Sequence, residues 1–142
     1  MSDFSQLSIA GRVATPADSD WDEARRAWNL ATDQRPDAVA FAESADDVAK
    51  VVRFAGQNGL KVAGQGTGHG AVALGSLDEA ILIKTERMRS VEVDGEARAA
   101  RVEAGVLALE LGEAAQLAGL CTLPGSTRPS RLRGSSRVFS ST

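Results

Sequence analysis

The stretch "RPDAVAFAESADDVAKVVRFAGQNGLKVAGQGTGHG", residues 35–70, decides the fold of this chain. A short apolar run predicts a strand, and Ser44 is typical of the N-cap of a helix that ends at Gly59. The apolar stripe predicted for this helix consists of Val48, Val51, Val52 and Ala55. The next run, "LKVAG" at residues 60–64, predicts a second strand. Residues 38–63 are therefore expected to form a compact strand–helix–strand unit.

The end of this stretch, Gly64–Gly70, has a glycine at every second position. Alternating glycines leave successive backbone N–H groups uncovered by a Cβ, so such a loop can curl around a phosphate or pyrophosphate. The side chains of Gln65 and Thr67 can add further donors. The pattern is neither a P-loop nor a dinucleotide fingerprint, and no helix is signalled after Gly70. By itself such a loop is more often a turn than a binding site, so both interpretations stay open.

His69 is the only histidine of the chain, and Cys121 is the only cysteine. A lone histidine in a loop is usually a surface or hydrogen-bonded residue, and no second histidine or cysteine cluster indicates a metal site. No nucleophile-elbow sequence supports serine catalysis. We therefore expect no metal site and a half-buried Cys121 thiol without a role, and no residue is assigned as catalytic.

Further elements are expected on both sides of the strand–helix–strand unit. They are a helix over residues 18–31, strands over 80–84, 90–94 and 100–104, and a helix over 106–118. Helical spacing would bring Trp21 and Trp28 to one side of the first helix, and Asp94-Gly95 is a hairpin signal. The predicted fold class is α+β: a strand–helix–strand unit, then a small antiparallel sheet and a helix.

Composition and charge narrow the function further. The 142 residues carry a net charge of -3, which argues against a nucleic-acid-binding protein. The tail over residues 127–142 has no acidic residue and is expected to be disordered. Its arginines alone give little support to a nucleic-acid contact. The N-terminus resembles no signal peptide, and no apolar run is long enough to span a bilayer. We therefore expect a cytoplasmic protein with neither a nucleic-acid nor a membrane partner.

The order of these pieces resembles a known family, the FAD-binding domain of the vanillyl-alcohol oxidase / p-cresol methylhydroxylase (PCMH) type. The berberine-bridge-like FAD-linked oxidases are the more similar members. The resemblance rests on residues 35–70, on "ILIKTERMRSVEVDGEARAARVEAGV" and on "GLCTLPGS", and covers roughly Gly11 to Ser126. It implies an N-terminal segment with one helix over residues 1–34, a partial FAD-binding PCMH-type domain over 35–126, and the tail.

The resemblance implies a cofactor, FAD, and the residues that hold it. These are Gly64, Gln65, Gly66, Thr67, Gly68, His69, Gly70, Gly125 and Ser126. His69 is the candidate for a covalent bond to the flavin, as in many members. Those members have an arginine where this chain has Gln65, which leaves covalent and non-covalent binding both open. Cys121 stands too early for the second covalent link that some members make.

The resemblance also implies a reaction. In such oxidoreductases a CH–OH or C–H group passes hydride to the flavin, and oxygen is the expected acceptor. The family continues beyond Ser126 with a glycine-rich segment and a substrate domain, whereas this chain has "TRPSRLRGSSRVFSST". We therefore expect a truncated or frameshifted relative, with a small-molecule substrate only in the full-length form. The alternative is an inactive remnant that binds FAD weakly or not at all.

Overall fold

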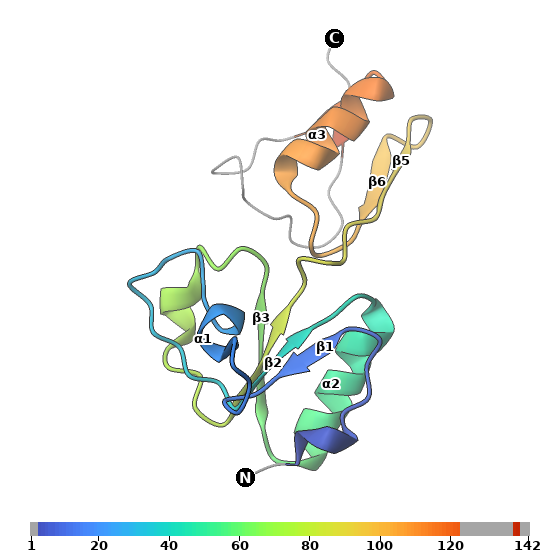
Figure 1. The fold of residues 1–142 in the computed structure, drawn as a ribbon. Coiled ribbons are helices and arrows are strands. Elements are labelled where there is room, and N and C mark those ends of the chain that lie inside the picture. The colour runs from blue at the N-terminus through green and yellow to red at the C-terminus, as the bar shows by residue number, and fades with distance from the viewer. Residues whose placement is uncertain (1–2, 123–137, 140–142) are drawn as a thin grey trace. The chain divides into compact units, whose positions relative to one another are not determined.

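The computed structural model describes residues 3–122 and 138–139, and the chain divides into two compact units, Met1–Arg87 and Met88–Thr142 (Figure 1). The first unit is built on a four-stranded sheet with the strand order β1-β2-β4-β3. Its elements are η1 (Phe4–Gln6), β1 (Arg12–Ala14), α1 (Trp21–Ala24), β2 (Ala38–Phe41), α2 (Ala45–Gln57), β3 (Lys61–Gln65), η2 (Ala71–Leu74) and β4 (Ala80–Lys84). The predicted α+β class is confirmed.

The centre of the sheet is parallel. Strands β2 and β3 each pair with β4 in parallel, and β1 pairs antiparallel with β2 at the edge. The predicted strand–helix–strand unit is present, and β4 extends it by lying between its two strands. Every residue of β2 and β4 is buried, as is typical of parallel strands covered on both faces.

Helix α2 begins and ends as its sequence predicts. The Ser44 Oγ accepts a hydrogen bond from the backbone N–H of Asp47 at 3.2 Å, and Gly59 follows the helix with φ of +69°. Val51 is buried, but Val52 is 50% exposed, so the predicted apolar stripe is wrong at that position. Phe54, one turn on from Val51, is buried instead and packs against Phe4.

Asp47 in α2 binds the N-terminal segment of the chain through hydrogen bonds. Its buried carboxylate accepts hydrogen bonds from the backbone N–H groups of Ala10 at 2.8 Å, Gly11 at 3.1 Å and Glu43 at 3.0 Å. Burial by itself would raise the pKa of Asp47, but the three N–H donors stabilise the charged form and hold the pKa below its ordinary value. This carboxylate therefore organises the edge of the sheet where β1 begins.

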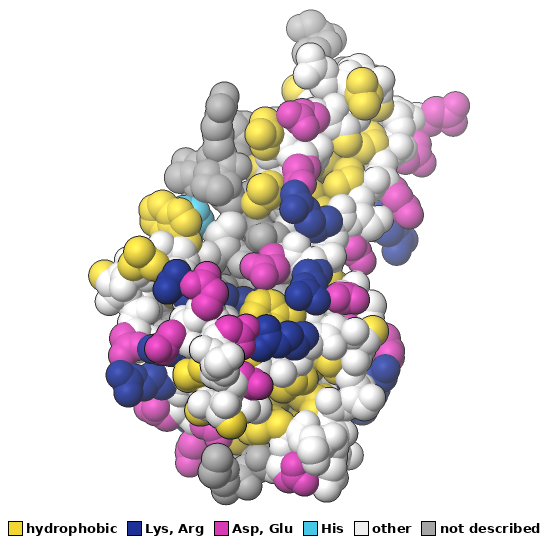
Figure 2. Space-filling view, in the orientation of Figure 1, with side chains coloured by type: hydrophobic (Ala, Val, Ile, Leu, Met, Phe, Trp, Pro, Cys, Tyr) yellow, Lys and Arg dark blue, Asp and Glu magenta, His cyan; other side chains and the backbone are white. Residues whose placement is uncertain are grey.

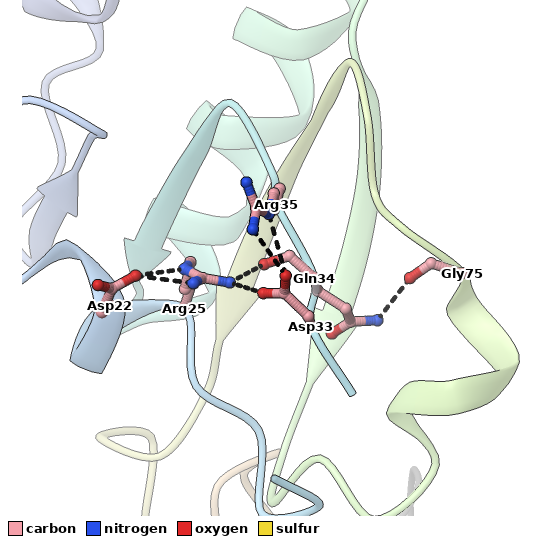
Figure 3. A network of polar contacts seen from close by, with 6 residues as sticks. All are labelled: Asp22, Arg25, Asp33, Gln34, Arg35 and Gly75. Carbon is pink, nitrogen blue, oxygen red and sulfur yellow. Dashed lines mark hydrogen bonds and ion pairs between the residues drawn. The ribbon is translucent and has the colours of Figure 1, made fainter. Parts of the chain in front are cut away.

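Helix α1 is much shorter than the predicted helix over residues 18–31, which is wrong beyond Ala24. The chain leaves the helix at Arg25, whose guanidinium pairs with Asp22 and Asp33 and donates to the backbone carbonyl of Gln34 at 2.8 Å (Figure 3). Tertiary contacts thus override helical propensity here. The core cluster that Trp21 packs against consists of Ala14, Ala24, Val39, Phe41, Ala63, Leu77, Ala80 and Leu82.

The second unit contains a hairpin and a helix. Its elements are β5 (Val91–Asp94), β6 (Ala99–Val102), α3 (Ala108–Leu117), β7 (Cys121–Thr122) and β8 (Val138–Phe139), with β5 and β6 antiparallel and β7 and β8 antiparallel. The hairpin turn at Asp94-Gly95 is confirmed, and the Asp94 carboxylate accepts from the backbone N–H of Glu96 at 3.0 Å. Cys121 is exposed, which corrects the expected half-buried thiol.

On the face drawn in Figure 2, positively and negatively charged side chains are mixed, and neither sign of charge forms a patch of its own. In residues 3–122 and 138–139, no helix is both long and apolar enough to cross a bilayer. The same residues contain no group of three or more His, Cys, Asp and Glu side chains placed to hold a metal ion.

Candidate functional site

The glycine-rich loop lies at the carboxyl end of the parallel strands. Gly64 and Gln65 complete β3, and Gln65 is in register with Lys84 at the end of β4. Residues 66–70, which we call the glycine turn, leave the sheet there and lead into η2, a short 3-10 helix where the sequence indicated none. Ligands of open α/β sheets commonly bind outside the carboxyl ends of the strands, so the turn lies where such a site is expected.

The backbone of the glycine turn offers donors. In the described part of the chain, none of the N–H groups of residues 66–70 donates a hydrogen bond to the protein. The carbonyls do accept: Thr67 from the N–H of Trp28 at 3.1 Å, and Gly68 from the N–H of Ala71 at 3.1 Å. Backbone N–H groups are strong donors that folded proteins rarely leave unpaired away from water. Five successive N–H groups therefore have no acceptor among the residues that the structure describes, although Gly68 itself is buried.

The glycines in and beside the turn lie in two different environments. Gly68 has φ of +87°, and a Cβ on it would stand 2.9 Å from the Cβ of Ala27 and 3.0 Å from the backbone nitrogen of Trp28. At Gly64 and Gly70 a Cβ would meet no atom within 4 Å. Glycine at Gly68 thus allows close packing within the protein, whereas Gly64 and Gly70 leave bare backbone facing open space. A cofactor could approach that bare backbone closely.

The carbonyl oxygen of Arg26 joins the segment after α1 to the ends of strands β3 and β4. It accepts hydrogen bonds from the Lys84 Nζ at 2.8 Å and from the Gln65 Nε2 at 3.3 Å, one from each of the neighbouring strands β4 and β3. Lys84 is 6% exposed, and burial lowers the pKa of its ammonium group. The sequence suggested Gln65 as a phosphate donor, but its amide N–H group is directed at Arg26. The Oε1 of Gln65 is buried and has no partner among the described residues.

Gln34 holds the other end of the turn. Its side chain is 1% exposed, and its Nε2 donates to the backbone carbonyl of Ala71 at 2.9 Å, where η2 begins. The same Nε2 donates to the carbonyl of Gly75 at 3.1 Å, just after η2 (Figure 3). Neither Gln34 nor Lys84 stood out in the sequence, because a single polar residue in a loop or at a strand end carries no pattern.

His69 lies at the end of the turn, half-buried. Its imidazole packs on the indole of Trp28, with ring centroids 4.0 Å apart and planes tilted by 38°. The Nε2 of His69 is buried and has no hydrogen-bond partner among the described residues. Of the predicted site residues, Gly64 to Gly70 form the end of β3 and the glycine turn, whereas Gly125 and Ser126 lie outside the described residues.

The first unit also contains a pocket of about 880 Å³, which lies away from the glycine turn. Phe4, Trp21 and Arg35 are among its lining residues, and no residue of the turn lines it. Its lining mixes apolar side chains with carboxylates and guanidinium groups. The candidate site therefore rests on the free backbone donors of the turn and not on this pocket.

Comparison with known proteins gives a consistent result. Residues 36–135 match a family described as FAD binding domain. The chain is 35% identical over 119 residues to (R)-6-hydroxynicotine oxidase of Paenarthrobacter nicotinovorans, covering 84% of this chain and 26% of that protein. It is 30% identical over 108 residues to an uncharacterised FAD-linked oxidoreductase of Bacillus subtilis, covering 76% of this chain and 23% of that protein. The chain thus spans about a quarter of the length of these curated relatives.

Solved structures share the fold. The crystal structure of 6-hydroxy-D-nicotine oxidase from Arthrobacter nicotinovorans superposes with a TM-score of 0.79 at 34% identity, over 88% of this chain and 28% of that chain. The structure of BBE-like 1 from Physcomitrella patens superposes with a TM-score of 0.78 at 26% identity, over 92% of this chain and 29% of that chain. The expected resemblance to the PCMH-type and berberine-bridge-like FAD-binding domain is confirmed.

Proposed function

Because the chain belongs to the FAD binding domain family, with FAD as its cofactor, we propose that it forms the FAD-binding portion of a flavin-dependent oxidoreductase. In this proposal the glycine turn holds the pyrophosphate of FAD. The observation that carries it is the run of five N–H groups, residues 66–70, without an acceptor in the described part of the chain. Charge-assisted bonds from backbone N–H groups to phosphate are roughly twice as strong as neutral ones.

The geometry of the turn supports this role. No atom lies within 4 Å of the Cβ position of Gly64 or Gly70, so the backbone beside the turn is uncrowded at both glycines. The hydroxyl of Thr67 is a further donor inside the same turn. Gln34 holds Ala71 just after the turn, and the carbonyl of Arg26 holds Gln65 just before it. Fixed flanks lower the ordering cost of binding. Gly125 and Ser126 stay predicted contacts of the same cofactor.

His69 is proposed to contact the flavin ring. Its buried Nε2 lacks a partner among the described residues, which supports a role toward a group outside the chain. A covalent bond from the imidazole to the flavin remains a prediction, because Gln65 stands where many covalently linked members have an arginine.

The chemistry belongs to the complete oxidoreductase. When bound, FAD supplies a hydride acceptor for a CH–OH or C–H group of a small-molecule substrate, with oxygen as the proposed final acceptor. The residues of this chain bind the cofactor and orient it, and none is assigned as a catalytic acid or base. We propose a cytoplasmic location and no nucleic-acid or membrane partner.

The full chain can be tested directly. After expression, visible absorbance reports bound flavin, and titration of the flavin-free chain with FAD gives a dissociation constant. Acid precipitation then separates covalently retained flavin from released flavin. The proposal predicts FAD binding that ADP, which carries the pyrophosphate, reduces by competition, whereas adenosine does not. A folded chain that binds no FAD would refute it and would favour the inactive remnant.

A further inference from the structure

We propose that Trp28 is a positioning residue for His69. This inference rests on the proposed function, because it concerns how the histidine is presented to the flavin. The indole and the imidazole are in direct contact, with ring centroids 4.0 Å apart and planes tilted by 38°. In this role the contact restricts the orientation of the His69 ring.

The exposure of Trp28 argues against a role in the core. Its side chain is 63% exposed, whereas Trp21, the other tryptophan of the chain, packs against the core cluster. An indole with so much surface in water gains little from burial. Within residues 3–122 and 138–139, the ring contact of Trp28 is the one with His69.

The backbone around Trp28 is built to hold this contact. Its N–H donates to the carbonyl of Thr67 at 3.1 Å, two residues before the histidine. One residue earlier in the chain, Ala27 packs directly against Gly68. The carbonyl of Arg26 is held by two donors from the sheet, as described above. The segment and the turn are therefore joined at successive positions, which fixes the distance between the two rings.

The short helix α1 has a consequence for this arrangement. A helix continuing through residue 31 would place Trp28 beside Trp21 on one helical face. Because the chain leaves the helix at Arg25, Trp28 instead reaches the glycine turn. The guanidinium of Arg25, paired with Asp22 and Asp33, stabilises this exit.

The test compares Trp28→Ala and Trp28→Phe with the matched control Trp21→Phe, all in the full chain. His69 is the only histidine, so histidine-labelled protein gives one set of ring signals in NMR spectra. The indole ring current should displace these signals in the flavin-free wild type. We expect the displacement to be lost in Trp28→Ala, retained in part in Trp28→Phe, and unchanged in Trp21→Phe.

FAD affinity is the second readout. We expect Trp28→Ala to raise the dissociation constant of FAD roughly 2- to 10-fold, as for the loss of one aromatic pair, with substantial rescue in Trp28→Phe. Circular dichroism checks that the variants fold, and Trp28→Phe carries the test if Trp28→Ala does not. Wild-type His69 signals that do not respond to Trp28, or an FAD affinity equal in all variants, would overturn the positioning role. Wild type that binds no FAD would instead overturn the proposed function, while the NMR signals still report the ring contact.

Discussion

Gly68 lies directly against Ala27, so closely that a Cβ on the glycine would stand 2.9 Å from the Cβ of the alanine. The same glycine has φ of +87°, a conformation that L side chains rarely adopt. The segment before the glycine turn is thus packed against the turn with no room for one additional methyl group.

Gly68→Ala should therefore damage both the stability and the site. We expect the free energy of unfolding to fall by about 1–3 kcal/mol, because the alanine must either clash or move the turn away from Ala27. FAD affinity should fall with it. Gly56→Ala in α2 is the matched control: no atom lies within 4 Å of its Cβ position, and alanine is the better helix former. Urea unfolding measures the stability of the two variants. Equal stability of Gly68→Ala and wild type would contradict the packing argument.

Removing the charge of Asp47 should loosen the start of the chain. Asp47→Asn keeps the shape but replaces one acceptor oxygen with a donor facing the N–H groups of Ala10, Gly11 and Glu43. We expect the free energy of unfolding at neutral pH to fall by about 2–4 kcal/mol. Hydrogen exchange at Ala10 and Gly11 should increase as well, and unchanged exchange there would show that the carboxylate does not hold this segment.

The same carboxylate predicts a pH dependence. The pKa of Asp47 lies below its ordinary value of 3.8 in the folded state, so its contribution is complete above pH 3.8 and is lost as the pH falls through the folded-state pKa. The difference in unfolding free energy between wild type and Asp47→Asn should therefore narrow as the pH is lowered below 3.8. Denaturant unfolding across this range measures it. A difference that stays constant into strong acid would contradict the assignment.

Ser44→Ala should cost about 1 kcal/mol of unfolding free energy, because it removes the side-chain acceptor for the N–H of Asp47 at the start of α2. Ser8→Ala, at an exposed position outside helices and strands, is the control and should stay within about 0.5 kcal/mol of wild type. Thermal or urea unfolding distinguishes the two, and equal values for both variants would show that the cap contributes nothing.

His69→Ala should weaken FAD binding roughly tenfold while the chain stays folded, because a half-buried aromatic contact is lost but the core is untouched. FAD titration and circular dichroism measure the two effects. If the wild type retains flavin after acid precipitation, the variant should release all of it. Flavin that stays with the precipitated variant would rule out His69 as the attachment point.

The elements that were predictable from the sequence are those with a local signal. Helix α2 has an N-cap at Ser44 and a glycine just after its end, and β4 begins with a run of four apolar residues, so both follow from short-range chemistry. The position of β4 between β2 and β3 is a long-range pairing, which periodicity does not reveal.

The candidate site also has a part that the sequence predicts and a part that it does not. The glycine turn was visible because bare backbone needs glycine in the sequence itself. The residues that hold it were not: Gln34 and Lys84 act through backbone carbonyls far along the chain, at Ala71 and Arg26. Trp28 was misplaced on a helix because its spacing from Trp21 fits a helical face, while the contacts of Arg25 end that helix early.

The amide NMR spectrum of the full chain, titrated with FAD, ADP and adenosine, shows whether the glycine turn binds the pyrophosphate of FAD. If the N–H groups of residues 66–70 bind the pyrophosphate, their signals shift with FAD and with ADP and stay in place with adenosine. Signals that remain unmoved while FAD binds elsewhere on the chain would contradict the claim.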